Sequence, residues 1–326
     1  MRRTLLRSKL KPEVFFFEFA TCGGETPDSI LVEGLGMFNA IYTGFLPFAS
    51  VKSFVKQEFQ SMFDLPVTQD WERSFDNCLN AEYALIVAPE DDFLLLNLTK
   101  KIEKANLKNL GSSSKAISVT SDKWKLYKKI KRRANVPKTS KKPFDKKFVV
   151  KPRVSCGGEG IEFSKNLSIK KGFIAQEYVE GKNISLSFII GDEINLLSIN
   201  EQLINNFKYA GAVVPFKIEP KLKKEVVEEC INAIECIKGL FGYVGVDVVL
   251  SDVPYIIEVN ARLTTPCVLF KDVYGINVAE LLYKNYYSKV KVDAKATKQL
   301  KLVKEKSNNG FVTARGYSLV KIPVIK

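Results

Sequence analysis

Residues 245–262 read GVDVVLSDVPYIIEVNAR, two segments rich in β-branched residues on either side of a Ser-Asp-Val-Pro turn. This pattern predicts a β-hairpin. If the turn takes four residues, Leu250 pairs with Tyr255, and continuing that register places Asp247 opposite Glu258. Cross-strand neighbours have Cβ atoms about 5 Å apart, so the two carboxylates repel each other unless a cation lies between them.

The cation that fits this hairpin best is Mg²⁺. One or two carboxylates together with phosphate oxygens are its usual ligands, which points to a bound nucleotide. Asn260 and Arg262 follow Glu258 on the same face, because side chains alternate along a strand. The alternative is a hairpin whose acids face water.

The composition is that of a globular protein. The chain has 326 residues, of which 46% are hydrophobic and 26% charged, enough for two or three subdomains. No run reaches the 18 apolar residues of a membrane span, so we expect no membrane association. The basic segment 1–11 and the apolar run 14–17 resemble a signal peptide, but the run stops at Glu18 without a small-residue cleavage site. We therefore expect a cytoplasmic protein.

Two residue types limit the chemistry. The six cysteines show no CxxC spacing, which favours free thiols over disulfides or a zinc site. The chain has no histidine, which excludes imidazole general bases and Ser-His or Cys-His nucleophiles. Catalysis must therefore use Lys, Arg, Asp, Glu or backbone groups.

The net charge of +14 points to an anionic partner. A nucleotide, a nucleic acid or an anionic substrate would satisfy it. Basic clusters occur at 128–133, 138–147 and in the tail 289–326, where we expect solvated surface. These clusters leave a basic nucleic-acid-binding protein as an alternative. Because no RNP1, KH or helix-turn-helix signature accompanies them, we expect no nucleic-acid partner.

The first block of the chain, from about residue 12 to 110, predicts a small α/β unit with a parallel sheet. It has strands at 14–19 and 83–87, with a helix between them for which Thr26 is the expected N-cap and Pro27 the first helical residue. Ligands of such sheets bind at the carboxyl ends of the strands. The substrate-contact candidates there are Glu18, Thr21, Cys22, Gly23 and Glu33.

The second block places two lysines near a glycine-rich loop. A helix is expected at 123–133 with Lys123 in its first turn, and a strand at 148–152 contains Lys151. The segment 153–160, RVSCGGEG, follows at once and could bring backbone N–H groups against phosphates, or be a plain hairpin loop.

The third block predicts an α+β arrangement. Its elements are strands at 173–179, 185–190 and 194–199, a helix at 221–241, the acidic hairpin and a helix at 277–286. In the tail, the segment 310–316 could be a closing strand or a partner contact.

Taken together, the two lysines, the glycine loop and the acidic hairpin resemble the ATP-grasp superfamily over roughly residues 115–285. The resemblance implies an N-terminal Rossmann-like domain (1–115), a central lid subdomain (116–176) and a C-terminal subdomain with a basic tail (177–326), the last two α+β and clasping ATP. It implies ATP and two Mg²⁺ ions, for which Mn²⁺ can substitute.

The resemblance also implies roles for individual residues. Lys123 and Lys151 match the lysines that bind the α- and β-phosphates, and Arg262 matches the cation beside an acyl phosphate. The metal ligands are Asp247, Glu258 and Asn260, and the catalytic pair is Lys151 and Arg262. The remaining nucleotide contacts are Ser155, Gly157, Gly158 and Gly160 in the lid, Gln176, Glu177, Tyr178 and Val179 in the adenine hinge, and Asn183 at the ribose.

Two positions depart from related enzymes. Asn183 stands where many relatives carry a ribose-binding acid, and Gly245 stands where D-alanine-D-alanine ligases carry an arginine. The first weakens the ribose assignment, and the second argues against that ligase.

Within the superfamily, four segments are similar to archaeal tyramine-glutamate ligases of methanofuran biosynthesis, and less closely to the pyrrolysine-pathway ligase. They are 17–24 (FEFATCGG), 33–35 (EGL), 86–90 (IVAPE) and 260–266 (NARLTTP). The similarity implies small-molecule substrates, with the γ-carboxyl of L-glutamate and tyramine joined through an acyl phosphate. Expected substrate neighbours are Asn200, Tyr209, Gly211 and Thr264.

Three alternatives stay open at this point. Cys156 beside glycines could be a nucleophile, although no histidine is present to activate it. The ligase could add amino acids to a peptide or protein. A homo-oligomer is also compatible with the sequence.

Overall fold

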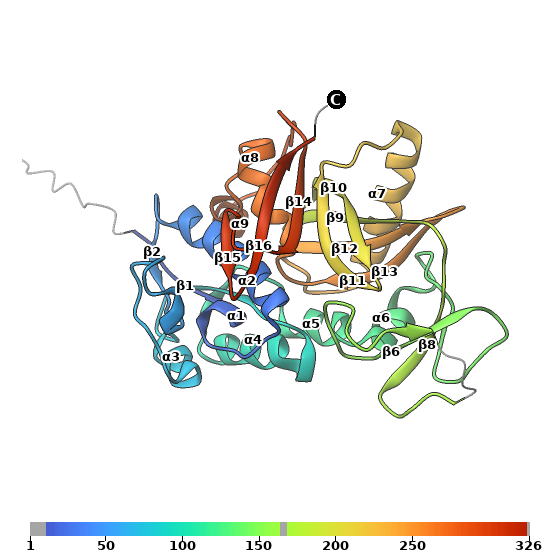
Figure 1. The fold of residues 1–326 in the computed structure, drawn as a ribbon, viewed down its shortest axis with the longest axis horizontal. Coiled ribbons are helices and arrows are strands. Elements are labelled where there is room, and N and C mark those ends of the chain that lie inside the picture. Colours follow the sequence, from blue (N-terminus) through green and yellow to red (C-terminus); the bar gives the residue numbers. More distant parts are fainter. Residues whose placement is uncertain (1–10, 164–167, 325–326) are drawn as a thin grey trace, which may run out of the picture.

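The computed structural model describes residues 11–163 and 168–324, and within them the chain forms three sheets. A four-stranded parallel sheet at the N-terminus and a four-stranded antiparallel sheet in the lid region lie below an eight-stranded antiparallel sheet (Figure 1). The basic segment 1–10 lies outside the described residues. Within the described ranges, no helix combines the length and the apolar character that crossing a membrane requires.

The N-terminal sheet is buried, as expected of parallel strands covered on both faces. Its central strand reads EVFFFE, and Phe15, Phe16 and Phe17 are all fully buried. The elements are β1 (Glu13–Glu18), α1 (Phe19–Cys22), α2 (Asp28–Phe45), β2 (Ser50–Lys52), η1 (Gln57–Phe59), α3 (Trp71–Asn77), β3 (Tyr83–Val87), η2 (Asp91–Phe93), α4 (Leu94–Lys104) and β4 (Lys108–Asn109), with sheet order β2-β1-β3-β4.

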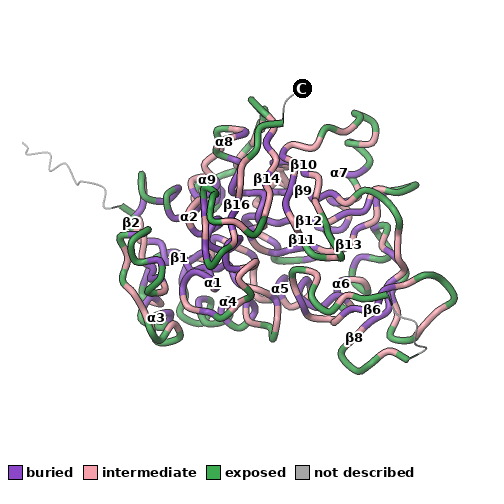
Figure 2. The backbone as a smooth tube through the Cα atoms, in the orientation of Figure 1, coloured by how far each residue is buried: buried purple, intermediate pink, exposed green. Residues whose placement is uncertain are grey.

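Helix α2 starts one residue later than expected. Pro27, not Thr26, occupies the N-cap position, with extended backbone angles and no side-chain cap. The Thr26 hydroxyl is buried and has no hydrogen-bond partner among the described residues. The N-cap prediction was therefore wrong. The helix is apolar on most of its circumference because it packs against both β1 and the C-terminal strands, and Figure 2 shows this buried region.

The lid region follows through two short helices. Asp122 caps the second helix by accepting from the backbone N–H groups of Trp124 and Lys125. That helix ends at Ile130, three residues before the predicted end. The elements are α5 (Ser114–Thr120), α6 (Lys123–Ile130), β5 (Thr139–Ser140), β6 (Phe148–Pro152), β7 (Glu162–Phe163) and β8 (Phe173–Glu177), with sheet order β5-β8-β6-β7.

The eight-stranded sheet forms the rest of the molecule, in the order β13-β12-β9-β10-β11-β14-β16-β15. Its strands are longer than predicted from the sequence, and its long helix is shorter, ending at Glu235. The elements are β9 (Lys182–Ile190), β10 (Ile194–Asn205), β11 (Lys208–Val214), α7 (Pro220–Glu235), β12 (Gly242–Leu250), β13 (Pro254–Asn260), η3 (Thr265–Leu269), α8 (Phe270–Tyr274), α9 (Val278–Tyr287), β14 (Leu300–Lys306), β15 (Val312–Ala314) and β16 (Tyr317–Pro323).

Strands between Leu300 and Pro323 in the basic tail belong to this sheet, which corrects the expectation that the whole tail is solvated surface. Strand β14 pairs with β11, and β16 pairs with β14 and β15, so segment 310–316 contributes a closing strand. Leu302 and Leu319 are fully buried, and Lys304, on the same face of β14 as Leu302, forms an ion pair with Glu33 at 2.5 Å. The high lysine content hid these strands in the sequence.

Candidate active site

The hairpin β12–β13 has a shorter turn than predicted. Leu250 pairs with Pro254, so the connection holds three residues instead of four, and the predicted pair of Leu250 with Tyr255 was wrong. Tyr255 instead pairs with Val249.

A β-bulge restores the predicted pairing of the two acids. Val248 pairs with Ile256 but Asp247 pairs with Glu258, so Ile257 is an extra residue on one strand. Ile257 and Glu258 both face the same cavity. The bulge therefore turns two successive side chains of β13 toward one side of the sheet.

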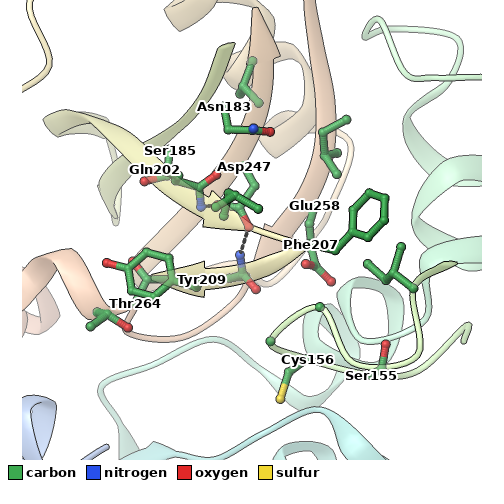
Figure 3. A pocket seen from close by; sticks show the side chains of 18 of the residues that line it. Ser155, Cys156, Asn183, Ser185, Gln202, Phe207, Tyr209, Asp247, Glu258 and Thr264 are labelled. Atoms are coloured by element: carbon green, nitrogen blue, oxygen red, sulfur yellow. Dashed lines mark hydrogen bonds between the residues drawn. The ribbon is translucent and has the colours of Figure 1, made fainter. Parts of the chain in front are cut away.

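These acids face a cavity of about 260 Å³ between the large sheet and the lid, which we call the hairpin cavity. In Figure 3, Asp247 and Glu258 project from the sheet toward the loop that carries Ser155 and Cys156. Ten of the predicted site residues line it: Lys123, Lys151, Ser155, Gly157, Gly158, Asn183, Asp247, Glu258, Asn260 and Arg262.

Asp247 is a half-buried carboxylate held by two amides. Gln202 Nε2 donates to its Oδ1 at 2.9 Å, and Asn260 Nδ2 donates to its Oδ2 at 3.0 Å. Burial and the neighbouring Glu258 raise the pKa of Asp247 to about 7. Sequence reasoning missed Gln202, because a polar residue on a half-buried strand carries no signal of its own.

The two lysines differ in their surroundings. Lys123 Nζ lies 3.0 Å from Glu258 Oε1 and donates to the Ser155 carbonyl oxygen at 2.6 Å. Burial lowers the pKa of Lys123, but Glu258 outweighs this and the net pKa is raised. For Lys151, burial and the charge of Lys123 lower the pKa to about 8.

The donor set fits a magnesium nucleotide. Among the described residues neither Asp247, with its raised pKa, nor Lys151, with its lowered pKa, forms an ion pair, and both line the same cavity. Within the described residues no group of three or more His, Cys, Asp or Glu side chains could cage a metal. Two carboxylates and the Asn260 amide leave the remaining positions of a Mg²⁺ shell to phosphate oxygens and water.

The Arg262 side chain is held in position by Glu90, a residue for which no role was predicted from the sequence. Its Nε and Nη2 each donate to a different oxygen of Glu90 at 2.8 Å, and its Nη1 donates to the Leu263 carbonyl at 3.2 Å. Burial lowers the pKa of Arg262, but Glu90 outweighs it and the net pKa is raised. Two of the five N–H groups of the guanidinium are left for another acceptor. Glu90 lies in the IVAPE segment but is far from the hairpin in sequence.

The glycine loop lies close over the sheet. Gly157, Gly158 and Gly160 all have left-handed φ angles between +64° and +77°. A Cβ on Gly158 would lie 2.0 Å from the carbonyl oxygen of Phe207, in the turn between β10 and β11. A side chain at position 158 would therefore push the loop off the sheet.

The predicted hinge lies outside the hairpin cavity, together with Gly160. Gln176 is buried and donates to Thr139 Oγ1, while the backbone N–H groups of Glu177 and Tyr178 donate to Lys138 and Lys147 carbonyls. Neither they nor Val179 are among its lining residues.

A second cavity of about 100 Å³ adjoins the first, and we call it the side cavity. Glu18 and Glu33, two of the N-terminal candidates, line it, whereas Thr21, Cys22 and Gly23 do not. The residues common to both cavities are Glu33, Cys156, Gly157, Tyr209, Arg262 and Thr265.

Of the other predicted substrate neighbours, some line a cavity and some do not. Thr264 lines the hairpin cavity near Tyr209, at the end opposite Phe207 in Figure 3. Asn200 is fully buried among serine hydroxyls, and Gly211 packs against the Leu302 carbonyl. Neither reaches a cavity wall.

Comparison with known proteins agrees with this geometry. Residues 120–266 match the ATP-grasp domain family, and residues 53–117 match the pre ATP-grasp 3 domain. Tyramine-L-glutamate ligases of Methanocaldococcus fervens and Methanocaldococcus jannaschii are 40% and 39% identical, each over 83% of this chain and over 93% and 88% of their own lengths.

A solved structure extends the match over the whole fold. A crystal structure of a protein from Archaeoglobus fulgidus, described as an ATP-grasp superfamily member, superposes with a TM-score of 0.87 at 47% identity, covering 96% of this chain and 100% of that one. This chain therefore belongs to the ATP-grasp superfamily and is an ATP-dependent carboxylate-amine ligase.

Proposed function

We propose that this protein joins the γ-carboxyl group of L-glutamate to the amine of tyramine, using ATP. The charged hairpin cavity carries the proposal of ATP-driven chemistry, because two lysines and two carboxylates converge on one space. The substrates rest on the similarity to tyramine-L-glutamate ligases, which extends over most of both chains.

The residues of the hairpin cavity have two roles, phosphate binding and metal binding. Lys123 and Lys151 take the negative charge of the phosphates, and Asp247, Glu258 and Asn260 would hold Mg²⁺. Bound Mg²⁺ supplies charge neutralisation on the phosphate oxygens. That two Mg²⁺ ions bind stays a prediction.

The reaction proceeds in two displacements. A glutamate carboxylate oxygen attacks the γ-phosphorus and ADP leaves, which forms an acyl phosphate. The tyramine nitrogen then attacks the acyl carbon, phosphate leaves, and the nitrogen loses a proton to give the amide. Arg262, fixed by Glu90, has two N–H groups left that could donate to the oxyanion or the departing phosphate. No covalent enzyme intermediate is required, which suits a chain without histidine.

The test is phosphate release from Mg-ATP with L-glutamate, with and without tyramine, with the product followed by mass spectrometry. We expect release that depends on both substrates and a product with the mass of glutamyl-tyramine. Turnover only with another amine, or a glutamate-containing peptide that grows in mass, would keep the ligase chemistry and replace these substrates. The adenine and ribose contacts at Gln176, Glu177, Tyr178, Val179 and Asn183, the cytoplasmic location and the oligomeric state also stay predictions.

A further inference from the structure

The side cavity has an apolar interior, unlike its charged neighbour. Phe19 and Ile30 contribute to its wall together with Met37, Val87 and Pro89. These residues come from α1, α2, the end of β3 and the segment after it, so the wall belongs largely to the N-terminal part of the chain. An apolar wall of this kind suits a compact hydrocarbon or aromatic group.

The charges at the side cavity favour a cation over a second acid. Lys304 donates to Glu33 at 2.5 Å and Arg262 is held by Glu90, so both cationic side chains in the wall are already neutralised. The Glu18 carboxylate is buried and accepts from Thr21 N and Oγ1 at 2.8 and 2.6 Å. It forms no ion pair within the described ranges, and burial raises its pKa. A dicarboxylate such as glutamate would therefore find both cationic side chains of this wall already paired.

Two hydroxyl groups at the side cavity lack partners. Thr26 Oγ1 and Tyr209 OH are buried and form no hydrogen bond with any described residue, and both residues line the cavity. Buried polar atoms in native proteins almost always have a partner, so such atoms in a cavity wall point to a ligand that supplies one.

The two cavities share part of their walls, because Tyr209, Arg262 and Gly157 line both. Under the proposed function Arg262 serves the acyl phosphate, so a ligand in the side cavity would border on the reacting groups.

We propose that the side cavity is the binding site of the amine substrate and selects a primary amine with an aromatic body and a hydroxyl group. The aromatic body packs among Phe19, Ile30 and Met37, and the hydroxyls of Thr26 and Tyr209 supply polar contacts. This assignment rests on the proposed function and adds to it which residues determine the choice of amine.

The test measures amine binding apart from turnover. Calorimetry on the full chain with Mg²⁺ and a non-hydrolysable ATP analogue gives the affinity for tyramine. Ile30→Phe places extra volume in the cavity, and we expect it to weaken tyramine binding at least tenfold. Thr43→Phe adds the same ring to an exposed position of the same helix and is the matched control.

A more conservative substitution separates an effect on amine binding from an effect on folding. Thr26→Val is nearly isosteric, and because the hydroxyl has no partner among the described residues we expect an unchanged melting temperature. Tyramine binds more tightly than phenethylamine if the hydroxyl contacts exist, and loss of one such contact costs about tenfold in affinity. We expect Thr26→Val or Tyr209→Phe to remove most of the difference between the two amines.

The outcomes separate this inference from the proposed function. Hydroxylamine is too small to need the side cavity, so its conversion to glutamyl hydroxamate with Mg-ATP and glutamate tests the acyl phosphate step alone. Absence of hydroxamate with the unaltered protein would refute the proposed function. Failure of the unaltered protein to bind tyramine, or an Ile30→Phe affinity equal to that of Thr43→Phe together with an unchanged amine preference in both hydroxyl variants, would refute the side-cavity assignment.

Discussion

The hairpin cavity and the side cavity share a wall at Arg262 but differ in chemistry. The first gathers charged groups such as Lys151 and Asp247, whose pKa values are displaced because burial and a neighbouring like charge disfavour their ionised forms. The second is apolar, and its cations are already paired. The difference separates a site for phosphate chemistry from a neighbouring site for substrate choice, so substitutions in the two should have different signatures.

The largest effect is expected in the hairpin cavity. Glu258→Gln should lower turnover by about 10³-fold, comparable to removing a main electrostatic contact of a transition state. The amide oxygen can still accept from Lys123, so the melting temperature should change little. Phosphate release is the measurement.

The control for this variant is Glu201→Gln, which removes the ion pair with Lys182 on β9 and β10 outside the cavity lining. Ligation by Glu258→Gln at the rate of that control would show that the carboxylate holds no metal.

At the shared wall, Glu90→Gln should lower turnover about 10- to 100-fold, as for other groups that orient a functional side chain. The neutral amide cannot hold both nitrogens of Arg262 as the carboxylate does. We expect the loss in kcat for both tyramine and hydroxylamine, since Arg262 serves the acyl phosphate and not one amine. Glu82→Gln, which loses an exposed pair with Lys108, is the control, and equal rates for the two variants would contradict the positioning role.

The displaced pKa values predict a bell-shaped pH dependence of Mg-ADP affinity. Asp247 keeps its proton up to about pH 7 and Mg²⁺ binds the ionised form, so affinity should fall as the pH drops below 7. Lys151 loses its proton near pH 8 and phosphate prefers the ammonium, so affinity should also fall above 8. Calorimetry across pH 5.5 to 9.5, in steps of about half a unit, would locate both limbs.

Single substitutions assign the two limbs. Asp247→Asn should flatten the acid limb, and Lys151→Arg should move the alkaline limb upward, because a guanidinium stays protonated. A pH-independent affinity in the unaltered protein would contradict both assignments. The sign for folding follows from the raised pKa of Asp247: without ligand, its contribution to stability is complete below its ordinary pKa and is lost as the pH rises through about 7.

The smallest effect is expected at Cys156, which lines both cavities. Burial and the nearby Glu90 raise the pKa of this thiol, and its Sγ donates to Asp91 at 2.9 Å, so it is a poor nucleophile. Cys156→Ser should keep turnover within about threefold, since covalent catalysis needs the thiolate. A loss of more than about a hundredfold in phosphate release would restore the nucleophile hypothesis.

Most of the residues named from the sequence come together in the hairpin cavity, because they lie in short segments with strong local patterns. A strand period of two places Asp247, Glu258 and Asn260 on one face, and the glycines of the lid loop mark a close backbone approach. The predicted pairing of Asp247 with Glu258 was correct although the predicted turn length was wrong. A shorter turn and a β-bulge, neither of which the sequence pattern indicated, compensate each other. Turn length and bulges depend on packing, which alternating residues do not encode.

What the sequence alone determined is the family, the residue types available for chemistry and the pairing of Asp247 with Glu258 in the acidic hairpin. Only the tertiary structure decided which distant residues meet: Glu90 with Arg262, Gln202 with Asp247, and the lysine-rich tail with the large sheet. The side cavity likewise gathers residues from segments separated by more than two hundred positions, such as Glu18 and Lys304. The spacing of apolar residues indicates whether one segment is a helix or a strand. A cavity wall depends on how several such elements pack together, and this packing produces no periodic pattern in the sequence.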